Sequence, residues 1–269
     1  MMNSTQKQKK ENIPNYGELW DTNYKYLEVL FRVLSFKQIV TAWQGLLLEK
    51  KLFLICTSKA TLSCVAHALV TSLFPFKWIH VYVSILPEKL KLFIDSPVPL
   101  IIGISLKVDL NDFPTDALIL NINKNRFENN FSQIQRLSGK LNAVLQKKLK
   151  HLKEKYNLDN PVNSDKWTDF QDEPFPSFEL DNRVKIDSTE IRHVFYNVFI
   201  YMFKDYNKFI GWEESKKYIN NSYQDEKQDI YQKIFKKKHF LKDNACNDEN
   251  DFVVYFLKRI YLINFLKHF

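Results

Sequence analysis

Apolar residues in the first fifty positions follow the spacing of two consecutive helices. Within residues 19–34 they recur at helical intervals, at Leu27, Leu30, Phe31 and Leu34. Ser35 then precedes the segment FKQIVTAWQGLLLE, with Gln38 three positions later in the register of a capping box. The pattern therefore predicts a helix pair that ends at the charged triplet of residues 49–51.

Four short apolar runs follow, and helix-like segments separate most of them. The runs are LFLICT, IHVYVSI, PLIIGI and ALILNI. LFLICT has no polar alternation, which is typical of a strand covered on both faces, and PLIIGI is expected to be another buried strand. Ser58 is expected to cap the helix KATLSCVAHALVTSLF, which Pro75 ends, and Pro87 is expected to begin a short helix, EKLKLFI. This order predicts an α/β fold with a mostly parallel central sheet and flanking helices.

The pattern changes after residue 123. A long, basic, amphipathic helix is expected over residues 131–156, and the Pro-, Asp- and Asn-rich residues 157–187 are expected to form a linker or surface loop. From residue 188 to the end, two aromatic-rich segments have helical spacing, which predicts an all-helical C-terminal subdomain. The expected division is a disordered tail (1–15), an α/β lobe (16–156), the linker (157–187) and the helical segment (188–269).

Composition indicates a folded protein. Of 269 residues, 45% are hydrophobic and 15% aromatic, which is enough to build a sizeable core and argues against disorder as the dominant state. The net charge of +8 comes from lysines spread over the whole chain, so we interpret it as a compositional bias and expect no nucleic-acid partner. Three cysteines without zinc spacing, no apolar leader and no long apolar run favour a cytoplasmic protein without a transmembrane helix.

The sequence lacks the common signatures of covalent chemistry and cofactor binding. It contains no Gly-rich phosphate loop, no G-x-S-x-G elbow, no H-E-x-x-H and no EF-hand loop. Two local features have alternative interpretations. Cys64 and His67 on one helix form either a nucleophilic dyad or, as we favour, a packed core pair. Thr57, Ser58 and Lys59 open a helix and form either an anion site or, again favoured, an N-cap.

Two larger surfaces have the same ambiguity. An aromatic stripe in the C-terminal part is either a partner groove or, at this spacing, part of the core, and consists of Phe195, Phe199, Met202, Phe203 and Tyr206. The basic segments 147–155 and 236–238 either contact membrane phosphates or, as we favour, form solvated faces. Residue patterns alone therefore predict a two-part binding protein without cofactor or metal.

Residues 27–122 resemble the central part of a DENN domain. The similar segments are LFRVLS, LLLEKKLFLICTS, LFPFKWIHVYVSILPEKL and DSPVPLIIGIS, in the family's order and spacing. The positions that match the family motifs are expected to be structural, and they are Glu49, Pro75, Trp78, His80, Pro87, Pro97, Pro99 and Gly103. The segment EIRHVFYNVFIYMFKDYNKFI resembles the opening of the downstream DENN segment through Arg192, Phe195 and Tyr206.

The resemblance implies a guanine nucleotide exchange factor without covalent chemistry. Such a protein binds a Rab-family small GTPase and promotes GDP release in membrane traffic, at vesicle or endosomal membranes. The family's upstream longin-like lobe has no counterpart before residue 27, so we expect a fragment or a reduced member. A DENN-like scaffold without exchange activity is the alternative; a basic membrane or nucleic-acid binder and an α/β-hydrolase are less favoured.

The expected GTPase contacts are loop residues at strand ends. Open α/β sheets bind ligands at the carboxyl ends of their strands. On that basis the candidates are Thr57, Ser58, Lys59, Asp95 and Ser96.

Overall fold

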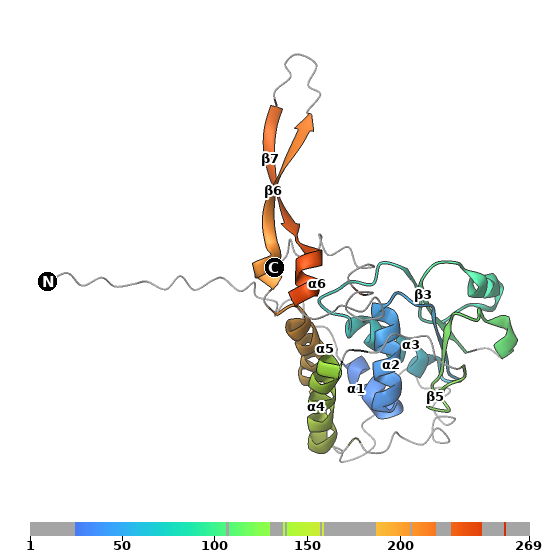
Figure 1. The fold of residues 1–269 in the computed structure, drawn as a ribbon. Helices are drawn as coiled ribbons and strands as arrows, with labels where there is room; N and C mark the ends of the chain where they lie inside the picture. The colour runs from blue at the N-terminus through green and yellow to red at the C-terminus, as the bar shows by residue number, and fades with distance from the viewer. Residues whose placement is uncertain are drawn as a thin grey trace.

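A computed structural model describes residues 25–105, 108–129, 137, 139–156, 158, 187–204, 206–218, 227–243 and 256. The first part of the chain alternates helices and strands (Figure 1). Its elements are α1 (Lys25–Val33), α2 (Phe36–Leu47), β1 (Leu52–Ile55), α3 (Lys59–Thr71), β2 (Val81–Val83), the 3-10 helix η2 (Glu88–Asp95), β3 (Leu100–Ile104), the 3-10 helix η3 (Leu110–Asp112), β4 (Leu118–Asn121) and β5 (Arg126–Phe127).

The central sheet has five strands in the order β2-β3-β1-β4-β5. Strands β2, β3, β1 and β4 are parallel, with Leu52 of β1 opposite Ile101 of β3 and Leu118 of β4. Strand β5 is antiparallel to β4 and follows it through a short turn. The sequence prediction of a mostly parallel sheet with flanking helices is confirmed, and the short β5 is an addition to it.

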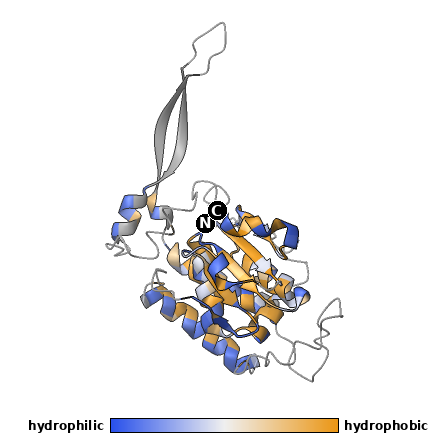
Figure 2. Cartoon of the chain, turned by 90° about the vertical axis from the view of Figure 1, so that its right-hand side faces the viewer, coloured by the Kyte–Doolittle hydropathy of each residue, from blue (hydrophilic) through white to orange (hydrophobic). Residues whose placement is uncertain are grey.

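Strands β1, β3 and β4 send alternate side chains into two separate hydrophobic clusters. Leu52 and Leu54 of β1 join the larger cluster, which contains residues of α1 to α6, whereas Phe53 between them joins the smaller one. The smaller cluster lies on the side of η2 and η3. Of the residues in these two short helices, Ile94 alone is buried. Figure 2 shows the apolar strands enclosed by the surrounding elements. This two-sided burial explains the continuous apolar runs of the strands.

Local sequence signals explain where the first helices begin. The Ser58 hydroxyl accepts a hydrogen bond from the Thr61 backbone N–H at 3.2 Å, so Ser58 caps α3 as expected. Ser35 precedes α2, but its hydroxyl makes no capping bond to the backbone and contacts the Gln38 side chain instead. The register of the expected capping box is therefore present without its reciprocal hydrogen bonds.

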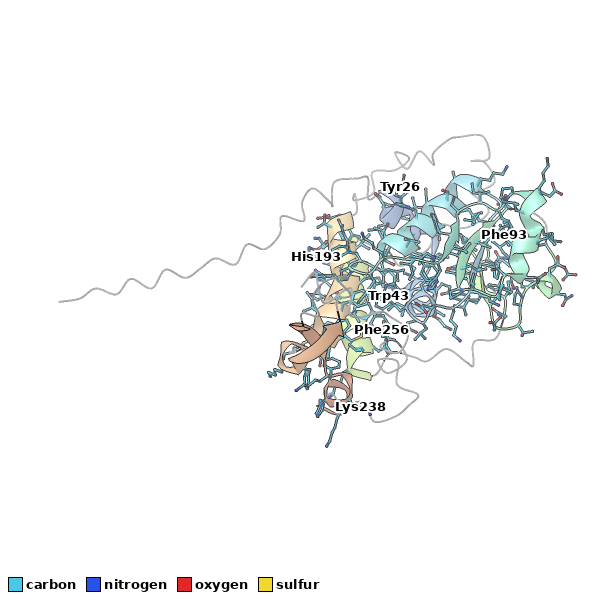
Figure 3. All side chains as sticks on the ribbon, turned by 90° about the horizontal axis from the view of Figure 1, so that it is seen from above. Tyr26, Trp43, Phe93, His193, Lys238 and Phe256 are labelled. Carbon is cyan, nitrogen blue, oxygen red and sulfur yellow. The ribbon has the colours of Figure 1, made fainter. Side chains whose placement is uncertain are left out.

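The second part of the chain begins with two helices that pack on each other. Helix α4 (Gly139–Tyr156) lies against α5 (Ser188–Met202), and both contribute buried residues to the larger cluster. Phe195 of α5 contacts Trp43 of α2, with ring centroids 5.1 Å apart. The C-terminal part is therefore joined to the α/β part through one continuous core, which includes Trp43 and Phe256, both labelled in Figure 3.

The expectation of an all-helical C-terminal subdomain needs one correction. After the 3-10 helix η6 (Tyr206–Phe209), the chain forms an antiparallel hairpin of β6 (Ile210–Tyr218) and β7 (Lys227–Phe235), followed by α6 (Lys237–Asp243). The hairpin projects away from the rest of the molecule in Figure 1. The two aromatic stripes dominated the sequence pattern, whereas the hairpin is stabilised by cross-strand backbone pairing, which leaves a weaker periodic signal.

Within the described ranges, no helix has the length and apolar character needed to cross a membrane. The boundaries at residues 15, 156 and 187 stay predictions. The expected disordered tail, most of the linker and most of the last aromatic segment lie outside the described residues.

Candidate functional site

The loop after β1 meets the turn after β4 at the carboxyl edge of the sheet. The Thr57 backbone N–H donates to the Asn123 side-chain oxygen at 3.0 Å, and the Asn123 amide donates to the Thr57 hydroxyl at 3.1 Å. Ser58 is buried and caps α3, whereas Thr57 and Lys59 are exposed. Of the three predicted contacts in this loop, Thr57 and Lys59 are therefore available to a partner.

A polar network holds the turn between β4 and β5 in place. The Asn121 amide donates to Glu128 at 2.8 Å, and the Ser35 backbone N–H donates to Asn125 at 2.9 Å. Asn125 has a φ of 46°, in the left-handed region that asparagine tolerates better than most residues. The hydrophobic pattern did not predict this turn, although the Asn-rich segment NINKN at the end of the last predicted strand was a turn signal.

Glu128 is the acidic centre of this turn. Its carboxylate lies 3.0 Å from both the Lys124 ammonium and the Arg126 guanidinium. Burial alone would raise the pKa of Glu128, but hydrogen bonds from Lys124 and Asn121 outweigh it and leave the pKa below its ordinary value. The carboxyl edge therefore presents the exposed cations Lys124 and Arg126, and these two side chains neutralise the Glu128 carboxylate.

Asp95 and Ser96 lie elsewhere in the topology. Asp95 ends η2, Ser96 caps it, and both precede the amino end of β3. Thr57 follows the carboxyl end of β1, and β1 and β3 are parallel. All five candidates were chosen because they were expected at the carboxyl ends of strands. Thr57, Ser58 and Lys59 do follow the carboxyl end of a strand, whereas Asp95 and Ser96 do not.

Three motif residues connect the end of α2 to the start of β2. Glu49 has a φ of 52°, and its carboxylate lies 3.1 Å from His80 Nε2. The Trp78 ring packs edge-on against the His80 ring at 5.0 Å and donates from Nε1 to the Val81 carbonyl at 3.1 Å. All three side chains are thus engaged in shaping the entry to the sheet.

The remaining motif residues in the α/β part shape turns and permit close packing. Pro87 lies at the start of η2, and Pro97 and Pro99 lie between η2 and β3. A Cβ on Gly103 would lie 2.0 Å from the Ser84 carbonyl oxygen, so only glycine fits there. Pro75 follows α3, as the sequence predicted.

The three motif positions of the C-terminal part have different surroundings. Phe195 is fully buried against Trp43, and Arg192, on the same helix α5, is only 4% exposed. Tyr206 begins η6. Phe199, Met202 and Phe203 are also buried, which places this part of the aromatic stripe in the core, as favoured from the sequence.

Cys64 and His67 form neither of the expected pairs. Cys64 is buried, and this burial raises the pKa of its thiol to about 11, which opposes thiolate formation. His67 is exposed, and its ring packs edge-on against Tyr26 at 4.8 Å. The two residues are one helical turn apart on the same helix, but only Cys64 belongs to the core, and its high thiol pKa opposes a nucleophilic role.

Two comparisons with known proteins agree with this arrangement. Residues 2–125 match the family described as the DENN (AEX-3) domain. Residues 2–125 therefore belong to the DENN domain family. This segment contains strands β1 to β4 of the central sheet, but not β5, and all eight motif positions from Glu49 to Gly103. Arg192, Phe195 and Tyr206 lie beyond it, so a downstream DENN segment stays a prediction.

Named relatives carry the same domain. The chain is 31% identical over 142 residues to DENN domain-containing protein 2B of Homo sapiens, which is 51% of this chain and 12% of that protein. It is 37% identical over 123 residues to DENN domain-containing protein 2C of Mus musculus (44% of this chain, 13% of that protein). Against DENN domain-containing protein 1A of Homo sapiens the identity is 29% over 123 residues (45% and 12%). The matched region thus spans about an eighth of these relatives' own length.

Proposed function

We propose that this DENN segment binds a Rab-family small GTPase and promotes release of its GDP. The observation that carries the proposal is the family match over residues 2–125, since DENN domains generally act on Rab GTPases. Exchange of this kind needs no covalent intermediate. A protein that binds the empty GTPase more tightly than the GDP-bound form lowers GDP affinity by the same factor.

The carboxyl edge of the sheet is the proposed contact surface. Lys59 is exposed beside Thr57, and the opposite turn adds the exposed Lys124 and Arg126. Two loops that are hydrogen-bonded to each other form a preorganised platform, which lowers the entropic cost of binding. A stable complex would bury on the order of 1,600 Å² in total, so this edge would be one part of a larger interface.

The direct test is release of a fluorescent GDP analogue from a panel of purified Rab GTPases. Acceleration of release from one or more Rab proteins by the full chain is expected. Binding to a Rab protein without acceleration would replace the proposal with the scaffold alternative, which keeps the DENN fold but does not open the nucleotide site. No binding to any member of the panel would reject both.

The contact surface is tested by charge reversal at the two candidate regions separately. Lys59→Glu should weaken Rab binding about tenfold, because it replaces a cation at the proposed edge with an anion and so reverses the charge presented to the partner there. A glutamate in the first turn of α3 is favourable to the helix, so folding should be kept. Lys204→Glu, an exposed position outside the DENN match, is the matched control.

Asp95→Lys examines the other candidate region. If the carboxyl edge alone binds the GTPase, this variant should bind like the unmodified chain. A loss confined to Asp95→Lys, with Lys59→Glu unaffected, would move the contact surface to the end of η2. Surface plasmon resonance on the Rab protein identified above measures all three variants.

A further inference from the structure

Helix α4 concentrates positive charge on its outer surface. Its 18 residues contain six lysines and one glutamate, a net charge of +5, whereas the whole chain carries +8. Its leucines and its terminal tyrosine are buried against the protein, and they are Leu141, Leu145, Leu149, Leu152 and Tyr156. Because these recur every three or four residues, they occupy one side of the helix. The lysines therefore lie on the remaining surface.

The exposed lysines of α4 are only partly neutralised by the protein itself. Lys150 lies 3.8 Å from Glu154, an exposed pair of little energetic weight. Lys155 lies 2.8 Å from Glu190 of α5, at the flank of the helix. Lys140, Lys147 and Lys148 are exposed, and none of them forms an ion pair with a residue that the structure describes.

We propose that α4 is a peripheral contact with the surface of an anionic lipid bilayer. At 1.5 Å per residue, the helix presents a convex basic face about 27 Å long, which suits a flat, negatively charged surface. Lysines on flexible stems attract such a surface without specific geometry. A nucleic-acid groove would call for arginine and stacking aromatic residues, and the exposed face of α4 contains neither.

The location of α4 leaves the DENN segment available. Helix α4 packs mainly on α5, which lies beyond residue 125. In Figure 1, α4 lies at the outside of the molecule next to α5. A bilayer bound to α4 would therefore contact the protein away from the carboxyl edge proposed for the GTPase.

The test is co-sedimentation of the full chain with vesicles, without any GTPase. Vesicles of phosphatidylcholine with about 30% phosphatidylserine should bind the chain, vesicles of phosphatidylcholine alone should not, and raising the salt should release it. Lys147→Gln/Lys148→Gln/Lys150→Gln should weaken binding about 100-fold, at a cost near 1 kcal/mol for each lysine. Glutamine is a good helix former, so α4 should stay folded, which circular dichroism checks.

The matched control removes three charges elsewhere. Lys77→Gln/Lys89→Gln/Lys204→Gln has the same net charge as the α4 variant and changes only exposed lysines. It should bind the anionic vesicles within about threefold of the unmodified chain, since only charges near the membrane contribute. Equal losses in both variants would overturn the proposal, as would no binding at all or tighter binding to an oligonucleotide than to the anionic vesicles. Because no GTPase is present, none of these outcomes bears on the exchange proposal.

Discussion

The two faces of the central sheet are buried by very different means. On one face, Trp43 and the aromatic residues of α5 extend a large cluster through six helices, α1 to α6. On the other face, two short 3-10 helices cover a small cluster, while Leu92 and Phe93 on η2 are 85% and 45% exposed. Figure 3 shows Trp43 deep among the helices and Phe93 at the far side. Stability is therefore expected to be concentrated on the helical face.

The largest effect is expected from Trp43→Ala on the helical face. Trp43 is fully buried, and its Nε1 donates to the Ser72 carbonyl at 3.1 Å. Truncation leaves a large cavity and an unpaired carbonyl, so the free energy of unfolding should fall by about 4 kcal/mol. Urea denaturation followed by fluorescence measures it. A loss below about 1 kcal/mol would show that the helical face is not the main source of stability.

Gly103→Ala should have the next largest effect, because it alters the contact of β3 with the chain after β2. The added Cβ would lie 2.0 Å from the Ser84 carbonyl oxygen, and backbone cannot yield as a side chain can. We expect a loss of about 3 kcal/mol in urea denaturation. Gly139→Ala is the control, since a Cβ there meets nothing within 4 Å and should leave stability equal or slightly higher. Similar losses in both would reject the explanation.

Phe113→Ala examines the thinly covered face. Phe113 is 7% exposed and packs edge-on against Phe53 at 4.9 Å. Because the cover of this face is thin, water and neighbouring side chains can partly fill the space, and we expect a loss of about 2 kcal/mol. Thermal and urea unfolding measure the loss. A loss as large as that of Trp43→Ala would remove the contrast between the two faces.

Leu92→Ser should have the smallest effect on stability. The Leu92 side chain is 85% exposed on η2, so its removal leaves no cavity. The change in the free energy of unfolding should stay within about 0.5 kcal/mol. A marked destabilisation in the same urea experiment would mean that η2 is covered by part of the protein beyond the described residues.

Much of the fold follows from local patterns. The apolar runs LFLICT, IHVYVSI, PLIIGI and ALILNI correspond to β1 to β4, and Ser58 caps α3 as predicted. These elements could be predicted because strand burial and helix capping both depend on residues that are neighbours in the chain. The antiparallel hairpin of β6 and β7 was missed because its pairing joins residues of two separate segments and leaves little trace in either strand.

The candidate site was predicted less well than the fold. Lys59 lies at the carboxyl edge as expected, but Asp95 precedes the amino end of β3 and therefore fails the criterion that selected it. The partner of Thr57 is Asn123, 66 positions away, which no local pattern indicates. Loops are placed by the strands they connect, and their neighbours depend on strand order.

The sequence by itself determined the strands, the helices and the DENN motif positions, because hydrophobic periodicity, caps and prolines act over a few residues. Tertiary structure alone decided that one face of the sheet lies against the large helical cluster, and the other against a small cluster with two short 3-10 helices. It also decided that the loops containing Thr57 and Asn123 meet, and that the lysines of α4 face outward while its leucines pack on α5. Such arrangements depend on contacts between residues far apart in the chain, which only the assembled core specifies.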